Sequence, residues 1–234
     1  MKNRKNLFLK YPGSIEDKLD NFEKYVRRQP LARFLARYEL FKKIIPVKGS
    51  IVECGVHLGG GVMAWAKMSS NFEPVAIARK IIGFDTFCGF PSLSEKDCSP
   101  TNENLKKFKP EYNVYEELLE CVSEYDDNRF LNHLPKVELI KGDALKTIPI
   151  YINDNRHLVV SLLFMDFDLY EPTKVALEHF VPRMPRGGII AFDEINNEHW
   201  AGETLAVLET FGSLNKLELR KFPFDPNIAY MVLS

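Results

Sequence analysis

Four acidic residues follow two apolar stretches in the second half of the chain. Asp166 and Asp168 come directly after one apolar run, and Asp193 and Glu194 come directly after the next. If the two runs form neighbouring parallel strands, about 4.8 Å apart, the four side chains converge at one edge of a sheet. On an extended chain, Asp166 and Asp168 are also expected to point to the same side, because they are two residues apart.

Carboxylates crowded into a half-buried cleft repel one another unless protons or a cation intervene. Hard oxygen ligands of this kind suit Mg²⁺ or a similar divalent ion. The alternative is that Asp168 and Glu171 serve the N-terminus of the following helix, where negative charge is favourable. That role explains one or two of the acids and leaves the pair on the next strand unexplained, so the pattern favours a metal site.

A glycine-rich turn in the first half of the chain has the composition of a ligand-binding loop. It runs from Ile51 to Gly61, with Gly55 placed for a sharp turn and three final glycines placed for close approach to a ligand at a helix N-terminus. His57 occupies the middle glycine position of the dinucleotide fingerprint, which disfavours a pyrophosphate ligand. Glu53 is placed to accept hydrogen bonds from a cationic amino-acid head group or from the loop's own amides. The alternative is that the glycines serve only tight packing.

Two further acids end strands of the same predicted sheet. Asp85 follows Ile81–Phe84, and Asp143 follows Val137–Ile140. In nucleotide-binding sheets an acid at such a position binds ribose hydroxyls. Asp85 alone is equally well explained as a turn or helix-capping residue. Three strands that end in an acid with glycine nearby nevertheless indicate a nucleoside ligand across this edge.

The elements that position these residues alternate between strand and helix. Continuous apolar strands separated by helices predict an α/β fold with a mostly parallel sheet covered on both faces. The last two strands are close enough to form a hairpin, so the last strand is expected to run antiparallel. The predicted strands are 51–54, 81–84, 137–140, 158–165, 188–192, 216–222 and 229–233, and the predicted helices include 62–68, 115–125, 172–184 and 203–211.

The N-terminal part of the chain differs in composition from the rest. We expect residues 1–48 to form a helical extension and residues 49–234 to form one domain, with a lid-like insertion near 86–136. A helix is predicted over 31–45, and Pro46 ends it. Its apolar positions are expected to be buried, namely Leu31, Phe34, Leu35, Tyr38, Phe41 and Ile45. Arg33, Arg37 and Lys42 are expected on its outer face.

Composition restricts the class of protein. With 234 residues, 45% hydrophobic and 27% charged, the chain has the make-up of an ordinary globular protein. The net charge of −1 disfavours nucleic acid as a partner. No apolar run has the length of a membrane span or follows the basic N-terminus as in a signal peptide, and the four cysteines lack CxxC spacing. We therefore expect a cytoplasmic protein with reduced thiols and no membrane partner.

The acid and glycine segments together resemble the macrocin O-methyltransferase family, which belongs to the class I S-adenosylmethionine-dependent methyltransferases and methylates sugar hydroxyls in bacteria. The most specific segment is Asp166-Phe-Asp-Leu-Tyr-Glu-Pro-Thr. The resemblance spans about residues 50–195 and implies a Rossmann-like, doubly wound, seven-stranded sheet. The segment that begins at Trp200 resembles a subgroup associated with deoxysugar, antibiotic or surface-polysaccharide pathways. The other matching segments are Glu53–Gly60, Gly83–Pro91, Gly142–Asp143 and Gly188–Glu194.

The resemblance also implies roles for individual residues. Gly55, Asp85 and Asp143 would contact the methionine, ribose and adenine parts of S-adenosylmethionine. Mg²⁺ would be held by Asp166, Asp193 and Glu194, although relatives often carry Asp-Asp or Asp-Asn in place of Asp193-Glu194, which leaves open which of the two binds the ion. The full set expected to bind the cofactor is Glu53, Gly55, Val56, Gly59, Asp85, Thr86, Phe87, Gly142, Asp143 and Asp166. Relatives of this kind often form homo-oligomers in which N-terminal segments help to close neighbouring sites.

The predicted reaction is methyl transfer from S-adenosylmethionine to a hydroxyl of a small sugar or glycosylated acceptor. Asp168 is the candidate base, and His57 or His199 is the alternative. A non-sugar acceptor, a metal-dependent hydrolase and a nucleoside-binding regulatory module are the alternative functions. A hydrolase would need basic phosphate ligands, and the sequence offers only Lys141 and the pair Arg79-Lys80. Aromatic residues expected to form walls of the acceptor site are Phe87, Phe90, Tyr170 and Trp200.

Overall fold

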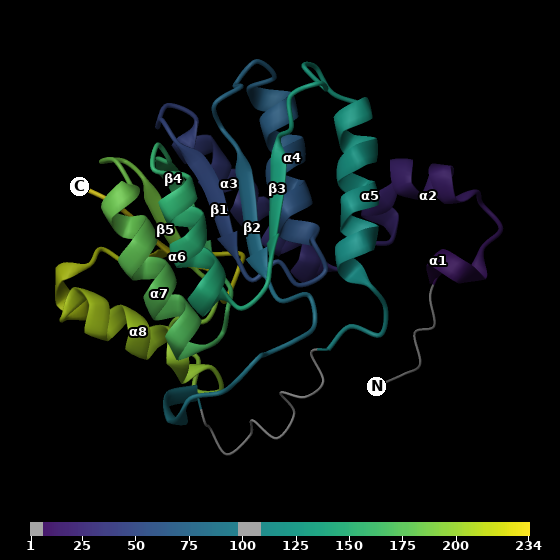
Figure 1. The fold of residues 1–234 in the computed structure, drawn as a ribbon. Coiled ribbons are helices and arrows are strands. Elements are labelled where there is room, and N and C mark those ends of the chain that lie inside the picture. Colours follow the sequence, from purple (N-terminus) through teal and green to yellow (C-terminus); the bar gives the residue numbers. More distant parts are fainter. Residues whose placement is uncertain (1–6, 98–108) are drawn as a thin grey trace.

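Seven strands form one mixed sheet in the order β3-β2-β1-β4-β5-β7-β6 (Figure 1). A computed structural model describes residues 7–97 and 109–234. The first five strands run parallel, and β7 runs antiparallel to both β5 and β6, as predicted. The bounds are β1 Ser50–Cys54, β2 Ile81–Asp85, β3 Val137–Lys141, β4 Val160–Met165, β5 Ile189–Phe192, β6 Arg220–Lys221 and β7 Ala229–Val232.

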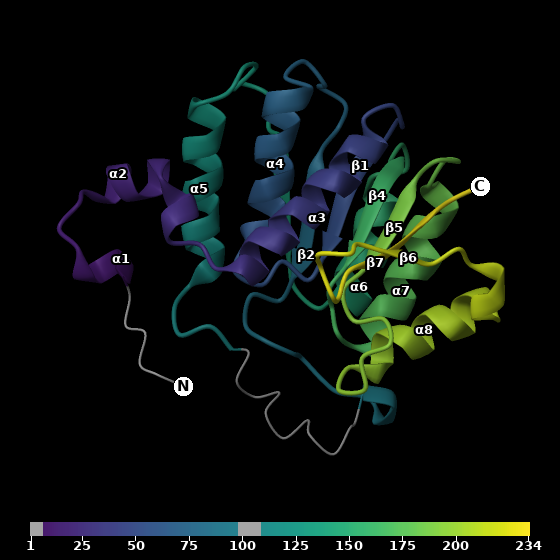
Figure 2. The same ribbon diagram turned by 180° about the vertical axis from the view of Figure 1, so that it is seen from behind.

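Helices cover both faces of the sheet because alternate strand residues are apolar on both sides. Ile51 and Ile81 belong to a core shared with α3, α4 and α5, which lie on one face (Figure 2). Val52 and Ile82 belong to a second core shared with α6, α7 and α8, which lie on the other face (Figure 1). The helix bounds are α3 Arg28–Ile44, α4 Gly60–Phe72, α5 Val114–Asp127, α6 Ala144–Asp154, α7 Tyr170–Phe180 and α8 Ala201–Phe211.

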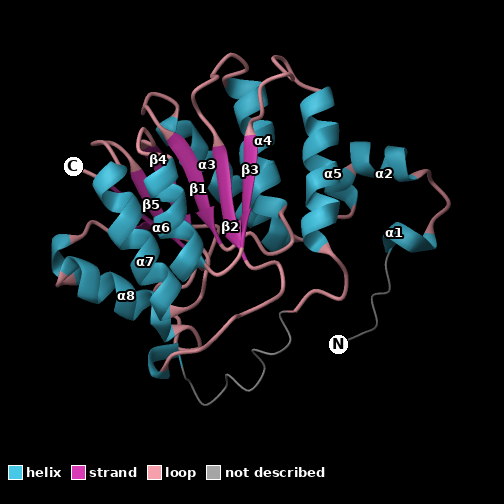
Figure 3. Cartoon of the chain, viewed as in Figure 1, coloured by secondary structure: helices cyan, strands magenta, loops and turns pink. Residues whose placement is uncertain are grey.

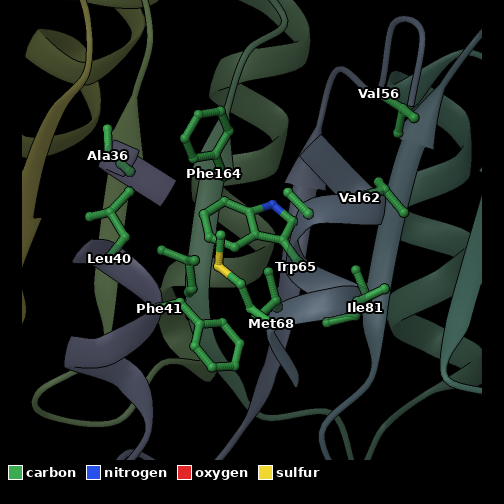
Figure 4. Packing of buried hydrophobic residues seen from close by; sticks show 14 of the residues in the cluster. Ala36, Leu40, Phe41, Val56, Val62, Trp65, Met68, Ile81 and Phe164 are labelled. Carbon is green, nitrogen blue, oxygen red and sulfur yellow. The ribbon is translucent and has the colours of Figure 1, made fainter. Parts of the chain in front are cut away.

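The first core is organised around Trp65 of α4 (Figure 4). Its ring is fully buried, and its centroid lies 5.7 Å from that of Phe164 on β4. Leu40 and Phe41 of α3 are also fully buried in this cluster. The N-terminal helix α3 is therefore an integral layer of the domain. Burial of several large side chains of this kind contributes roughly 1.5–3 kcal/mol for each.

Two short helices precede α3 and lie beyond α5, away from the sheet (Figures 1 and 2). They are α1, Leu7–Lys10, and α2, Ile15–Asp20. The helical extension predicted for residues 1–48 is thus present from residue 7 onward, and its first six residues lie outside the described part. The exact domain boundaries stay a prediction.

Three elements differ from the sequence prediction. Helix α6 was not predicted, and Pro149 lies inside it. The strand predicted over 216–222 is reduced to the two residues of β6, because Leu217 and Leu219 pack against the second core without joining a ladder. Helix α7 ends at Phe180 and continues as a 3₁₀ turn, since Pro182 lacks the N–H that a longer helix requires.

The long connection between β2 and β3 contains the predicted insertion. Its helix α5 packs against α4, where the Tyr125 hydroxyl donates a buried hydrogen bond of 2.8 Å to the Ala66 carbonyl. The 3₁₀ turn Glu95–Asp97 lies near the start of α8, and Figure 3 shows how this loop passes below the carboxyl edge of the strands. Residues 98–108 lie outside the described part, so the lid stays a prediction.

The sequence also predicts that the chain has no membrane span and that its cysteines are reduced. Within residues 7–97 and 109–234, none of the helices combines the length and apolar character needed to cross a membrane. Cys54, Cys88 and Cys121 are free thiols, and Cys98 lies outside the described residues.

Candidate active site

A cavity of about 620 Å³ opens at the carboxyl edge of the sheet, between α3 and the loops that follow β1 to β5. Gly59, Tyr170 and His199 are absent from its lining, and the other residues that the sequence singled out as site candidates line it. The candidates that line the cavity are Glu53, Gly55, Val56, His57, Asp85, Thr86, Phe87, Phe90, Gly142, Asp143, Asp166, Asp168, Asp193, Glu194 and Trp200.

Strand register explains why acids at the ends of neighbouring strands meet here. Cys54 of β1 is paired with Phe84 of β2 and with Met165 of β4, and Met165 is paired with Phe192 of β5. The acids that close β2 or follow β4 and β5 therefore leave the sheet at one level. Parallel strands place their carboxyl ends on a common edge, which is where α/β sheets bind ligands.

The glycines of the first turn have separate structural roles. Gly55 has φ +96°, and a Cβ there would overlap the carbonyl of Asp166. At Gly61 a Cβ would overlap the carboxylate of Glu53, whereas at Gly60 it would meet no atom of residues 7–97 or 109–234 within 4 Å. Gly55 and Gly61 are thus required by the protein's own packing, and Gly60 leaves open space at the cavity.

Glu53 is a buried acid whose two oxygens have different surroundings. Its Oε1 lies 3.7 Å from a guanidinium nitrogen of Arg37, and its Oε2 makes no hydrogen bond within the described part of the chain. Burial raises the pKa of Glu53 to about 7, against the opposing charge of Arg37. A buried oxygen without a partner is costly unless a ligand supplies a donor. Glu53 therefore fits a cationic ligand group.

Asp85 and Asp143 accept hydrogen bonds from backbone amides near the cavity. Asp85 accepts from the amides of His57 at 2.8 Å and Phe87 at 2.7 Å. Asp143 caps α6 by accepting from the amide of Leu145 at 3.0 Å. Asp85 therefore has a turn role and Asp143 a capping role. Both side chains also line the cavity, where their carboxylate oxygens can accept further hydrogen bonds.

Arg33 and Arg37 do not lie on the outer face of α3, which corrects the sequence prediction. The Arg33 guanidinium donates to Asp193 Oδ1 at 2.5 Å and to Asp166 Oδ2 at 2.6 Å. The predicted apolar stripe is right at Phe41, which is buried, and wrong at Phe34, Leu35 and Ile45, which are each about two-fifths exposed. The residues of α3 that are buried are Ala32, Ala36, Leu40, Phe41 and Ile44.

Asp168 has a left-handed backbone, with φ +63°. The expectation of an extended chain from Asp166 to Asp168 is therefore wrong, although both acids reach the cavity. Burial raises the pKa of Asp168 well above its usual range, and the charges of Glu194 and Asp193 raise it further. His57 and Phe87 also have positive φ, so uncommon backbone conformations gather around this cavity.

Burial and the charge of Asp193 raise the pKa of Asp166, and the Arg33 guanidinium opposes that rise. Burial is also the main cause that raises the pKa of Glu194 to about 7, followed by the charge of Asp193. The charges of Asp166 and Asp193 outweigh burial at Arg33 and raise the pKa of its guanidinium, which stays protonated. This side of the cavity therefore combines crowded acids with one embedded cation.

Glu203 of α8 lies behind the cavity lining and supports the site, a role that the sequence reasoning did not assign. It is fully buried, its Oε1 accepts from the Glu194 amide at 2.8 Å, and its Oε2 makes no hydrogen bond with any described residue. Burial raises the pKa of Glu203 well above its usual range. The sequence signal that could have identified Glu203 was its position in the family-like segment that begins at Trp200. Its contact fixes the loop that carries Glu194.

Tyr170 and Gly59 have structural surroundings outside the cavity. The Tyr170 amide donates to Asp97 at 2.6 Å, and its hydroxyl donates to Glu209 of α8. Gly59 precedes α4 with φ +84°, and Leu118 of α5 occupies the space beside it. His199 lies in the loop before α8 with its side chain about half exposed.

Phe90 and Trp200 form an aromatic wall of the cavity. Their ring centroids lie 5.7 Å apart, and both residues line the cavity. They come from the loop after β2 and from the start of α8, so two distant segments shape this side.

The arrangement does not fit the Mg²⁺ site implied by the resemblance. Two of the three expected ligands, Asp166 and Asp193, are bound to Arg33. Among residues 7–97 and 109–234, no group of three or more His, Cys, Asp or Glu side chains is arranged to hold a metal ion. The acids have the chemistry of magnesium ligands, but a guanidinium lies between them.

Solved structures of other proteins resemble this chain. The chain is similar to the calicheamicin methyltransferase CalS11, with 32% identity and a TM-score of 0.90 over 95% of this chain and 87% of that chain. An apo structure of CalS11, described as a TDP-rhamnose 3'-O-methyltransferase, matches with 30% identity and a TM-score of 0.83 over 97% of this chain and 90% of that one. The O-methyltransferase NovP shares the fold, with 22% identity and a TM-score of 0.67 over 87% of this chain and 80% of that one. A sequence search among curated proteins gives no match.

The family profile described as macrocin-O-methyltransferase (TylF) matches residues 32–219, which is most of the chain. The chain therefore belongs to the macrocin O-methyltransferase (TylF) family and is an S-adenosylmethionine-dependent O-methyltransferase.

Proposed function

We propose that this enzyme transfers the methyl group of S-adenosylmethionine to a hydroxyl of a sugar or a sugar-containing small molecule. One observation carries the proposal: a single cavity is lined by Glu53, Asp85 and Asp143 on the β1–β3 side and by crowded acids on the β4–β5 side. The two CalS11 structures support the acceptor class, since one is described as acting on TDP-rhamnose.

The β1–β3 side has the groups that the cofactor needs. Glu53 has a buried oxygen that accepts no hydrogen bond from the described residues and fits the ammonium of the methionine part. Asp85 has acceptor capacity left for ribose hydroxyls, and Gly60 leaves room for close approach. We assign Asp143 and Gly142 to the adenine end on the same basis, because both line this side of the cavity.

When bound, S-adenosylmethionine supplies a methyl group on an electrophilic sulfonium. The protein then has to align the acceptor oxygen with that methyl carbon and take up the hydroxyl proton. The acceptor oxygen forms the new bond to carbon as the carbon–sulfur bond breaks and its electrons stay on sulfur. We assign the proton to a carboxylate oxygen of Asp168, whose raised pKa makes it a stronger base than an exposed aspartate.

Magnesium dependence stays a prediction of the sequence. The steps above are assigned to the chain's own residues, and Arg33 is bound to two of the expected metal ligands. The homo-oligomer and the cytoplasmic location are likewise predictions. Leu7, Leu9, Ile15 and Leu19 of the first two helices are well exposed, and multi-angle light scattering on the full chain measures the stoichiometry directly.

A hydrolase acting on phosphate esters fits less well. Arg79 is engaged at the opposite end of the sheet, where it donates to the Gly49 carbonyl at 2.8 Å and to the Ser161 hydroxyl at 2.5 Å. Lys141 lies over the ring of Tyr115, with its Nζ 4.8 Å from the centroid. Neither of these basic residues lines the cavity, and the arginines that do line it, Arg33 and Arg37, are paired with its acids.

Calorimetry and a product assay test the proposal. S-adenosylhomocysteine is expected to bind with a Kd in the micromolar range, which corresponds to about −8 kcal/mol. Incubation with S-adenosylmethionine and a panel of nucleotide-linked deoxysugars is expected to give a product heavier by one methylene, detected by mass spectrometry. Asp168→Asn is expected to bind the cofactor normally and to lose at least about 100-fold in rate. The proposed sugar acceptor would be rejected if the enzyme binds the cofactor and methylates a hydroxyl of another class of compound but none of the sugars.

A further inference from the structure

Arg33 joins two acids that come from different strands. One guanidinium nitrogen lies 2.5 Å from Asp193 and the other lies 2.6 Å from Asp166. We propose that Arg33 is the resident cation of this site and that a divalent ion binds between Asp166 and Asp193 only when the Arg33 guanidinium is removed. The proposal concerns the protein's own charges and holds for any methyl acceptor.

The position of Arg33 is fixed by the packing of α3. Leu40, Phe41 and Ile44 of this helix are fully buried against the sheet and α4. The carbonyl of Ile44 also accepts a hydrogen bond of 3.1 Å from the buried guanidinium of Arg79. Arg33 therefore reaches the acids from an anchored helix.

The surroundings of Arg33 hold its guanidinium over the sheet. Its central carbon lies 6.0 Å from the ring centroid of Phe164 on β4, and Asp166 directly follows the end of that strand. One helical turn further, the central guanidinium carbon of Arg37 lies 5.2 Å from the centroid of the same ring, and one of its terminal nitrogens lies 3.7 Å from Glu53 Oε1. Arg33 and Arg37 thus both lie over the Phe164 ring. Arg33 pairs with Asp166 and Asp193, and Arg37 pairs with Glu53.

The chemistry of the guanidinium suits this role. It is planar, always charged, and presents a fork of N–H donors that can serve two carboxylates at once. Mg²⁺ needs oxygen ligands at about 2.0–2.1 Å in near-octahedral geometry. An ion that close to Asp166 and Asp193 would lie against the guanidinium, where like charges repel and one oxygen of each carboxylate already accepts a hydrogen bond from Arg33.

Mn²⁺ binding, measured by electron paramagnetic resonance and calorimetry without cofactor or acceptor, tests the proposal. The full wild-type chain is expected to bind Mn²⁺ no more tightly than a Kd of about 1 mM. Arg33→Ala is expected to bind it at least about tenfold more tightly, since two buried carboxylates lose their counter-charge. Adding Asp193→Asn to Arg33→Ala is expected to abolish that gain.

Lys42→Ala is the matched control, because Lys42 lies on the same helix and pairs with Glu39 at 2.8 Å. It is expected to behave as wild type. Arg33→Met keeps the aliphatic stem and serves if Arg33→Ala does not fold, as judged by circular dichroism. Micromolar binding of one Mn²⁺ per wild-type chain, lost in Asp193→Asn, overturns the proposal, and so does a folded Arg33 variant that gains no affinity. Neither result bears on whether the chain transfers methyl groups.

Discussion

The two sides of the cavity neutralise their acids in different ways. On the β1–β3 side, Asp85 and Asp143 accept hydrogen bonds from backbone amides of their own or adjoining loops. On the β4–β5 side, Asp166 and Asp193 are bound by Arg33, which is 133 and 160 residues away along the chain. Asp85 and Asp143 on the first side are therefore held by loops at the strand ends, and only Glu53 there pairs with α3, through Arg37. On the second side the charge balance of Asp166 and Asp193 depends on that distant helix.

This difference separates the roles of the two sides. Backbone amides hold Asp85 and Asp143 in place whatever the state of α3, which suits binding of a constant cofactor. The acids on the other side remain crowded, with the pKa values of Asp168 and Glu194 raised, which suits proton uptake from an acceptor. Substitutions that act on one side alone can test whether the two sides are independent.

The largest effect is expected at Gly55, where the two sides join. Gly55→Ala puts a Cβ into the Asp166 carbonyl at a positive φ, so we expect a loss of about 3 kcal/mol or more in the free energy of unfolding. Urea denaturation measures it. Gly60→Ala is the control, with open space at its Cβ and an expected change below about 1 kcal/mol. Equal effects of the two substitutions would contradict the assigned close approach.

The next effect concerns Arg33 and Asp193. Because the two side chains are in direct contact, Arg33→Ala and Asp193→Asn are expected to show a coupling energy of about 1–3 kcal/mol in a double-mutant cycle of unfolding. Asp85→Asn in place of Asp193→Asn is the control and is expected to couple by less than about 0.5 kcal/mol. Coupling of Arg33 to Asp85 as strong as to Asp193 would remove the distinction between the two sides.

Glu53→Gln is expected to weaken S-adenosylhomocysteine binding by about tenfold, since it removes a charge-assisted hydrogen bond. The pKa of Glu53 is about 7, above its usual value, so the stability it gives the free protein is full at low pH and is lost as the pH rises through 7. Binding of an ammonium group has the opposite sign because it needs the ionised acid. We therefore expect wild-type affinity to rise from about pH 6 to 7.5 and Glu53→Gln to remove the rise.

Glu194→Gln is the control for that pH dependence, because the pKa of Glu194 is also about 7 but the residue lies on the β4–β5 side. Calorimetry on this variant is expected to reproduce the wild-type slope. A slope that disappears in Glu194→Gln and persists in Glu53→Gln would reverse the assignment.

The smallest effect is expected at Asp143. Asp143→Ala removes the cap of α6 and is expected to cost about 1 kcal/mol in thermal unfolding, whereas Asp143→Ser keeps a capping oxygen and most of the stability. If Asp143 also contacts the cofactor, both variants weaken S-adenosylhomocysteine binding alike. Normal binding in the serine variant would leave Asp143 with a structural role alone.

Much of the fold could be predicted from local patterns. The strands around Ile51, Ile81 and Leu162 are short continuous apolar runs, and each is followed by the acid or glycine that marks a strand end. The meeting of Glu53, Asp85 and Asp143 at the cavity was predictable for the same reason, since each of these acids lies at or next to a strand end. Helix α6 was not predicted because Pro149 interrupts its helical pattern.

Helix α3 shows where local pattern fails. Hydrophobicity assigns the buried stripe to its large residues, but the face in contact with the sheet includes Ala32 and Ala36, and Phe34 and Leu35 are exposed. Small residues allow a helix to approach a sheet closely, and this preference is not visible from side-chain hydrophobicity. The rotation of the helix then decides which polar residues face the cavity.

The sequence determined the identities of the acids, their places at strand ends and the enzyme family, because strand register carries each acid to a common edge. Only the tertiary structure decided the partner of Asp166 and Asp193, since the packing of α3 turns Arg33 inward from more than a hundred positions away. A pairwise charge contact depends on distance in space, and the spacing of residues along the chain does not contain that distance.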